Sequence, residues 1–368
     1  ARISSARALS DPILKFELSN VPLRNFDFDS TPMSGKQLML SQRIPYWGKR
    51  TALAAIEDHG KKASQAVYND HSAIITNEVK QGFYDLAFLD RAIAITEKNR
   101  DLLKDFVRIA QTKYSVGTGL QQDVLKAQVS LSELRDRLIV LRQERRRTGA
   151  RLNAVLNRTT RDPLGSPGIV KQTPYAYSLD ELQQMAFEGS SYLEGLQQVT
   201  RRWQTTEHLQ RLSYLPDFNL SLGYRQRDFT ADPVKGSDFL SVGLAINLPI
   251  YRGGKQDQLV REALAMRKAS EARYDAAKRQ LFLRIEQAHI DIETHREQSV
   301  LYQTSIIPQA EQVLAVAMAA YQVGKVNFMT LLNNQVTLLN FEIKQYHHLT
   351  EGEKALAQLE AAVGKRLF

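Results

Sequence analysis

The 368-residue chain contains no cysteine, which excludes disulfides, thiolate metal sites and cysteine nucleophiles. It also contains no run of eighteen or more apolar residues, although 43% of its residues are hydrophobic. A transmembrane helix is therefore excluded, whereas membrane-crossing β-strands are not, because their alternating pattern leaves no hydropathy plateau. No signal peptide is visible from Ala1, so we expect a mature or trimmed chain.

Enzyme motifs are missing as well. The sequence has no phosphate loop, no His-Glu-x-x-His and no nucleophile elbow, so we expect no enzyme, no catalytic residue and no cofactor. His347 and His348 point about 100° apart around a helix, and His289 and His295 also face differently, so no metal site is expected. The basic residues behind the net charge of +9 are spread over the predicted helices among acidic ones, which indicates solvated helical faces. The run Arg145–Arg147 is interpreted as a solvated helical face too, so no nucleic-acid partner is expected.

An internal duplication organises the chain. The segment Tyr114–Leu125 recurs as Tyr321–Leu332. The same register continues beyond it, because Gln128-Val129 in the first copy corresponds to Gln335-Val336 in the second. Each copy interrupts a long helical pattern and follows, at a distance, a pair of short alternating strands. A repeat on this scale predicts two copies of one structural unit.

Apolar residues spaced by three and four positions predict long amphipathic helices. The first runs from about Lys49 to Tyr114 without proline, and at ~1.5 Å per residue it would be on the order of 95 Å long. A second helix is predicted from about Gln121 to Asn157, and the short turn between the two requires an antiparallel hairpin. Gly117 and Gly119 supply the left-handed or open backbone that ends the first helix.

The second half repeats this arrangement. After an irregular connector rich in proline and glycine, the pattern predicts one helix over 179–212. A helix of about seventy residues then begins near Lys255, and a last one covers 327–363.

Four segments show the strict alternation of β-strands, and they form two hairpins. The later hairpin pairs 217–225 with 240–248 through a polar, flexible loop, Gln226–Ser237, and the earlier strands lie around 14–19 and 37–41. One side of each strand is large and apolar, and the other is small or polar. An apolar outside and a polar inside are typical of a water-filled barrel in lipid.

Four strands cannot close such a barrel, because the smallest membrane barrels have about eight. Several chains must therefore share one barrel, and three chains would supply about twelve strands. Tyr46, Trp47 and Tyr251 lie just past the strand ends, where an interfacial aromatic girdle is expected.

These features together resemble a known family. The duplicated unit, the two Tyr-x-Val-Gly turns, the entry 214–217 into a strand and the exit 45–50 from another resemble the TolC-like outer membrane factor (outer membrane efflux protein) family. The resemblance covers Leu9 to Leu367. The form Gln-Arg-Ile-Pro-x-x-Gly-Lys-Arg at 42–50 is most similar to the heavy-metal cation efflux (CzcC-like) branch.

The resemblance implies a mainly α fold with membrane β-structure, in which a β-hairpin and a long helical hairpin occur twice. It implies a homotrimer, with a twelve-stranded barrel in outer-membrane lipid on a periplasmic α-helical barrel. The function it implies is the exit duct of a tripartite efflux system for heavy metals or drugs, with an inner-membrane pump of the RND type and a periplasmic adaptor (membrane fusion protein). The expected segments are the hairpins 1–48 and 216–252, the helical hairpins 49–157 and 253–368, and the equatorial connector 158–215.

The resemblance also assigns roles to the helix–helix turns. In the family these turns form the periplasmic tip that docks with adaptor hairpins, and the matching residues are Val116, Gly117, Thr118, Val323, Gly324 and Lys325. From the residues alone, Val-Gly simply ends a helix. In the second turn Asn327 suits a helix N-cap, whereas its counterpart Leu120 is a poor cap, for which Thr118 is the available substitute.

A gate is implied near the tip. Tyr321 and Asp123 match the tyrosine–aspartate gate pair of the family, although Asp123 equally suits ordinary stabilisation of a helix N-terminus. Val326 stands at the position of the gate arginine, and Thr330 and Asn333 stand where acidic ring residues often lie. A ring of neutral side chains there would not attract cations as carboxylates do, and it predicts a weaker lock on the closed state.

Two alternatives remain from the residues. A periplasmic adaptor or coiled-coil scaffold also uses long helical hairpins, but it predicts a soluble protein without lipid-pattern strands. A basic helical membrane-bending module predicts no strands.

Overall fold

The computed structural model describes residues 2–229 and 237–367. The chain divides into two compact units, one made of Ala1–Val67 and Tyr192–Ala277 and the other of Tyr68–Ser191 and Lys278–Phe368. Most of the predicted Gln226–Ser237 loop, residues 230–236, lies outside the described residues.

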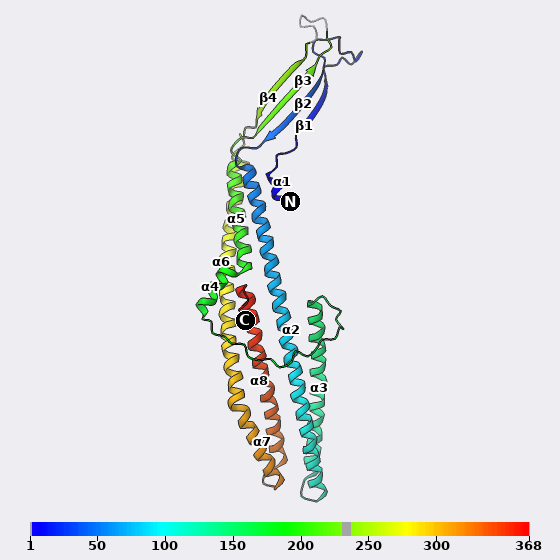
Figure 1. The fold of residues 1–368 in the computed structure, drawn as a ribbon, viewed down its shortest axis with the longest axis vertical. Coiled ribbons are helices and arrows are strands. Elements are labelled where there is room, and N and C mark those ends of the chain that lie inside the picture. Colours follow the sequence, from blue (N-terminus) through cyan, green and yellow to red (C-terminus); the bar gives the residue numbers. More distant parts are fainter. Residues whose placement is uncertain (1, 230–236, 368) are drawn as a thin grey trace. The chain divides into compact units, whose positions relative to one another are not determined.

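The first unit contains a four-stranded antiparallel sheet. Its strands are β1 (Ile13–Ser19), β2 (Gly35–Ile44), β3 (Phe218–Gln226) and β4 (Phe239–Ile246), in the order β1-β2-β3-β4 (Figure 1). The two predicted hairpins are therefore confirmed, and they join through β2 and β3 into one sheet. The short helix α1 (Arg2–Arg7), which precedes β1, is not predicted by the sequence.

The register of the sheet lines up side chains of one kind. Leu14 lies opposite Leu40, Leu40 opposite Leu222, and Leu222 opposite Val242, and these four residues are between 45% and 74% exposed. On the other face, the adjoining row brings Ser41, Ser221 and Gly243 together. The sheet thus has one large apolar face exposed in the described chain and one face of small and polar residues.

Long helices make up most of the rest. They are α2 (Lys49–Ser115), α3 (Gln121–Val155), α4 (Leu179–Gly189), α5 (Ser191–Leu212), α6 (Gln256–Leu301), α7 (Ile307–Gln322) and α8 (Phe328–Val363). The proline-free pattern from Lys49 is confirmed as one unbroken helix. The connector predicted from Arg158 is irregular up to Ser178, and the preceding helix ends at Val155, two residues before its predicted end. None of the described helices is both long and apolar enough to cross a membrane.

The core of the second unit is formed by α2, α3, α7 and α8 near their turns. Phe106, Leu331 and Phe328 are fully buried there, together with Tyr321. This apolar cluster explains why the two helical hairpins pack against each other at that end, since each buried large apolar side chain contributes about 1.5–3 kcal/mol. It also fixes the positions of the two turns.

The prediction of a single helix over 179–212 is wrong. The chain breaks at Ser190, whose φ of −69° and ψ of 109° are extended. At the break, a Cβ on Gly189 would lie only 3.0 Å from the carbonyl oxygen of Val363. The break therefore lets the end of α4 approach the end of α8, a tertiary contact that the helical pattern does not reveal.

The prediction of one uninterrupted helix from Lys255 is also wrong. A π-helical turn, η1 (Tyr302–Ile306), separates α6 from α7, and Pro308 follows directly in the first turn of α7. Proline lacks an N–H and its ring clashes with the carbonyl four residues earlier. The wider π turn accommodates that defect within a continuous helical path.

Candidate functional site: the paired helix–helix turns

The two predicted tip turns have the same backbone structure. Gly117 and Gly324 adopt left-handed φ angles of 74° and 76°, and their N–H groups donate to Tyr114 O at 3.0 Å and Tyr321 O at 3.1 Å. The next N–H in each turn donates five residues back, from Thr118 to Lys113 O and from Lys325 to Ala320 O, both at 2.9 Å. Each turn is therefore a Schellman motif, which satisfies the last carbonyls of its helix.

Each turn also presents one valine to solvent. Val116 is 66% exposed and Val323 is 69% exposed. A Cβ added to Gly117 or Gly324 would meet no atom within 4 Å, so the left-handed backbone, and not close packing, requires glycine there. Each turn therefore presents an exposed valine next to a glycine whose Cα faces open space.

Gly119 has a different role from the predicted one. Its φ is not in the left-handed region, but a Cβ there would lie 2.8 Å from Lys113 Cβ and 3.0 Å from Tyr114 N. Gly119 therefore permits close approach of the chain to the end of α2, and its own N–H also donates to Lys113 O at 2.9 Å.

The two turns differ in how the next helix begins. Asn327 Oδ1 accepts from Thr330 N at 2.9 Å and from Thr330 Oγ1 at 2.8 Å, which confirms it as the N-cap of α8. Leu120 makes no side-chain cap for α3 in the described chain. Thr118 does not replace it, because its hydroxyl donates to Lys113 O at 3.2 Å, in the preceding helix.

Lys113 joins the two turns, a role that was not predicted from the sequence. Its Nζ donates to the carbonyl oxygen of Gln322 at 3.0 Å and lies 5.0 Å from the ring centroid of Tyr321. The ammonium group thus binds the C-terminus of α7, where orphan carbonyls and the helix dipole favour a cation. A comparison of the two copies would have indicated a role for Lys113 in only one turn, because the equivalent residue in the second copy is Ala320.

The residues matched to the gate lie beside this contact. Tyr321 is 5% exposed and packs edge-to-face on Phe328 at 5.6 Å, and among the described residues its hydroxyl has no hydrogen-bond partner. Burial, followed by the charge of Asp123, raises the pKa of the Tyr321 hydroxyl. Burial also raises the pKa of the Asp123 carboxyl. The charge of Asp123 therefore acts on the hydroxyl of Tyr321, whereas burial alone accounts for the raised pKa of Asp123.

The remaining positions matched to the gate do not join this pair. Thr330 and Asn333 are exposed, and Thr330 is engaged by the cap of its own helix. Val326 is partly buried and packs against the apolar cluster.

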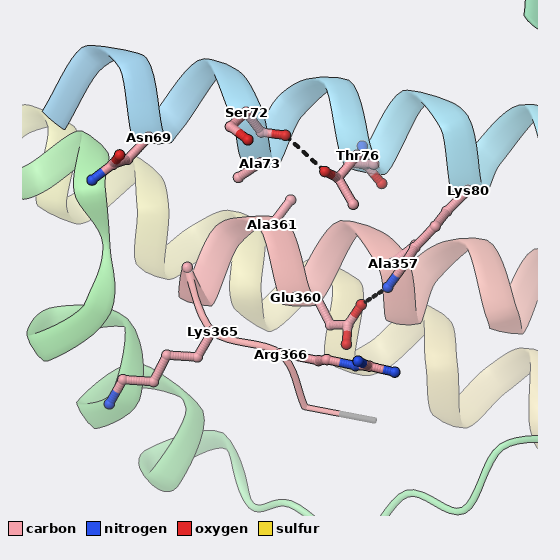
Figure 2. Close-up of a pocket in the computed structure, with 12 residues that line it drawn as sticks. Asn69, Ser72, Ala73, Thr76, Lys80, Ala357, Glu360, Ala361, Lys365 and Arg366 are labelled. Atoms are coloured by element: carbon pink, nitrogen blue, oxygen red, sulfur yellow. Dashed lines mark hydrogen bonds and ion pairs between the residues drawn. The ribbon is translucent and has the colours of Figure 1, made fainter. Parts of the chain in front are cut away.

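The second unit also contains a cavity of about 480 Å³ between α2 and α8 (Figure 2). Lys80 extends from α2 to the carboxylate of Glu360 on α8, and Glu360 also accepts from Leu367 N at 3.0 Å. None of the described residues that line the cavity is a histidine, and its acidic side chain, Glu360, is already paired with Lys80. The cavity therefore lacks a convergent catalytic set.

The arginine run lies in a charged helical face. Arg145 pairs with Asp90 through Nη2 at 3.3 Å, and Arg147 pairs with Glu144 at 3.2 Å. Across residues 2–229 and 237–367, no group of three or more histidine or acidic side chains is placed to hold a metal ion.

The fold is that of outer membrane channels. VceC of Vibrio cholerae superimposes with a TM-score of 0.80 at 17% sequence identity, covering 100% of this chain and 89% of VceC. CusC gives a TM-score of 0.80 at 13% identity, with coverage of 99% and 85%. The predicted fold class, a TolC-like duplicated hairpin arrangement, is confirmed.

The sequence comparisons define the family. The model of the outer membrane efflux protein family matches residues 1–158 and 195–365, so the chain belongs to the outer membrane efflux protein family. The cobalt-zinc-cadmium resistance protein CzcC of Cupriavidus metallidurans is 22% identical over 365 residues, covering 99% of this chain and 83% of CzcC. The predicted function, an efflux channel of the outer membrane, is confirmed, and the adaptor and membrane-bending alternatives are set aside.

Proposed function

We propose that three copies of this chain form one passive exit duct, which receives substrates from an inner-membrane pump of the RND type through a periplasmic adaptor. The observation that carries the proposal is the sheet with one exposed apolar face and one small, polar face. In lipid, such a sheet faces hydrocarbon on one side and a water-filled lumen on the other. No catalytic step is part of this function.

The open edges of the sheet require more than one chain in the barrel. In the described chain, β1 and β4 are the outer strands of the four-stranded sheet. Open edges within hydrocarbon leave backbone groups unsatisfied, so β1 of one copy pairs with β4 of the next. Three copies give about twelve strands, above the minimum of about eight for a membrane barrel. Segments 1–48 and 216–252 would form the barrel, 49–157 and 253–368 the helical hairpins, and 158–215 the connector.

The tip turns are the proposed adaptor-docking surface. Val116, Gly117 and Thr118 occupy the first turn, and Val323, Gly324 and Lys325 the second. Their matching Schellman motifs and exposed valines support this role, because a partner hairpin would bury apolar surface against two equivalent helix ends. The gate is proposed at Tyr321 and Asp123, with Thr330 and Asn333 at the neutral ring.

The assembly is tested by the mass of the detergent-solubilised protein. We expect three chains per particle after correction for bound detergent, and a monomer or dimer in mild detergent would contradict the duct. Because CzcC is named for cobalt, zinc and cadmium resistance, we further propose that divalent metal cations are the substrates. Deletion of the gene should sensitise its host to these cations more than to organic drugs, and the opposite selectivity would contradict the substrate class.

A further inference from the structure

Two histidines that are far apart in sequence meet in the second unit. His295 on α6 and His348 on α8 form a hydrogen bond between their Nδ1 atoms, which are 3.2 Å apart, and a bound metal ion would replace that bond. Their ring centroids are 5.5 Å apart, and both side chains are partly buried. Sequence spacing relates only histidines that are close along the chain, His347 with His348 and His289 with His295, and it does not reveal this pair.

The separation of the two nitrogens suits a shared metal ion. Zn²⁺ binds imidazole nitrogen at about 2.0–2.1 Å, and two ligands at a tetrahedral angle then lie about 3.3 Å apart. The observed 3.2 Å agrees with that value, so a cation can bridge both Nδ1 atoms without displacement of either helix. Each imidazole then carries its remaining proton on Nε2.

Polar and aromatic side chains lie near the two histidines. One helical turn away, Gln345 Nε2 donates to Ser299 Oγ at 3.3 Å. The ring of Tyr302, the first residue of η1, lies 5.6 Å from that of His348. His347 does not join the pair, because it packs on Phe88 at 5.3 Å. The protein therefore supplies two imidazoles, and water would complete the coordination.

We propose that His295 and His348 form a two-imidazole binding site for borderline divalent cations of the Zn²⁺ type. A bound ion bridges α6 to α8 about two helical turns before the π turn η1, and thereby stiffens the second helical hairpin. With only two protein ligands, the site exchanges its ion readily. The inference goes beyond the proposed duct function, since it depends only on the packing of these two helices.

The test uses the full chain in detergent without a polyhistidine tag. Titration calorimetry with ZnCl₂ should give one site per chain. Removal of a side chain that only hydrogen-bonds to a metal ligand weakens metal binding by about 10–100-fold. Removal of a ligand itself, by His295→Gln or His348→Gln, should therefore weaken Zn²⁺ binding by at least about tenfold. His71→Gln is the matched control, because His71 is an exposed helical histidine on α2, and it should bind Zn²⁺ like the wild type.

Thermal unfolding provides the second measurement. Zn²⁺ should raise the Tm of the wild type and of the His71→Gln variant, but not that of either site variant. Mg²⁺, which prefers oxygen ligands, should leave all four unchanged. Equal Zn²⁺ affinity in the wild type and both site variants, or an equal Tm shift with Mg²⁺, would overturn the site.

Discussion

Lys49 Nζ lies 2.7 Å from Asp217 Oδ1, and the two side chains are only 12% and 11% exposed. Asp217 also accepts from Arg43 Nη2 at 2.9 Å and from the backbone N–H of Tyr46 at 3.0 Å, while Lys49 donates to Leu215 O at 2.7 Å. The exit motif of the first repeat and the entry motif of the second therefore meet at one carboxylate. This contact holds the start of α2 against the start of β3 within the first unit.

We expect Asp217→Asn to lower the free energy of unfolding by about 3–5 kcal/mol, because it leaves a buried ammonium group without its ionic partner. The matched control is Asp228→Asn. Asp228 pairs with Lys36 at 3.0 Å, but these side chains are 36% and 38% exposed, about three times more than the Asp217 pair, so the loss should be under about 1 kcal/mol. Denaturant unfolding in detergent measures both, and equal losses would show that burial does not set the strength of the Asp217 contact.

The difference between the two helix starts predicts opposite effects of substitution. Asn327→Ala removes the cap of α8 and should cost about 1 kcal/mol. Leu120→Asn supplies the missing cap of α3, where Leu120 is largely exposed, and should add a similar amount. Both variants are tested by measuring the free energy of unfolding and the amide exchange at the first turns of α3 and α8. A destabilising Leu120→Asn would mean that Leu120 makes apolar contacts beyond the isolated chain.

The contact between Lys113 and the C-terminus of α7 predicts a role in tip closure. Lys113→Met keeps the length of the side chain but removes the ammonium group that binds Gln322 O and covers Tyr321. If the closed duct depends on this contact, single-channel conductance in planar bilayers should rise. Lys113→Arg, which retains the charge and the donors, should stay near the wild-type conductance. A conductance that is the same in all three proteins would contradict the closure role.

Periodicity predicted the regular parts of the fold, but not its interruptions. The spacing of apolar residues located α2 and the four strands. One side of α2 is buried, and each side of every strand carries side chains of one kind, so both produce a regular pattern in the sequence. The break at Ser190 depends on contact between Gly189 and the end of α8, which no local pattern contains. The π turn before Pro308 was predictable in principle, since proline inside a helical pattern always requires a local defect.

The site shows the same division. The glycine turns were evident from the repeated Tyr-x-Val-Gly, and both are present with left-handed glycines. The role of Lys113 was not predicted because the prediction of the turns used residues that the two copies share, and Lys113 differs from its equivalent in the second copy. The pairing of His295 with His348 depends on which helices pack side by side, and sequence spacing carries no such information.

The connector between the repeats is fastened by a buried carboxylate. Glu353 on α8 is 3% exposed and accepts from Thr173 N at 2.8 Å and from Thr173 Oγ1 at 2.6 Å. Since hydrogen bonds to charged groups contribute about 1.5–3 kcal/mol each, Glu353→Ala should release the segment around Thr173. Limited proteolysis should then cut within 158–178 faster than in the wild type. Glu342→Ala, which alters a less buried carboxylate of the same helix, should not increase cleavage there.

The pKa of Asp123 distinguishes its two possible roles. Stabilisation by the N-terminus of α3 would hold the pKa of a carboxyl group below its ordinary value, but burial raises the pKa of Asp123 above 3.8. The folded chain therefore keeps this proton to higher pH than the unfolded chain does, and ionisation of Asp123 opposes folding. Its contribution to stability is greatest below pH 3.8 and falls as the pH rises through the raised folded value.

Asp123→Asn should abolish that fall, so the variant should become more stable relative to the wild type as the pH rises from about 3 to 7. Unfolding free energies of the two proteins across this range measure the difference directly. A wild type that gains stability over the variant with rising pH would instead mean that the carboxylate is stabilised by the helix N-terminus.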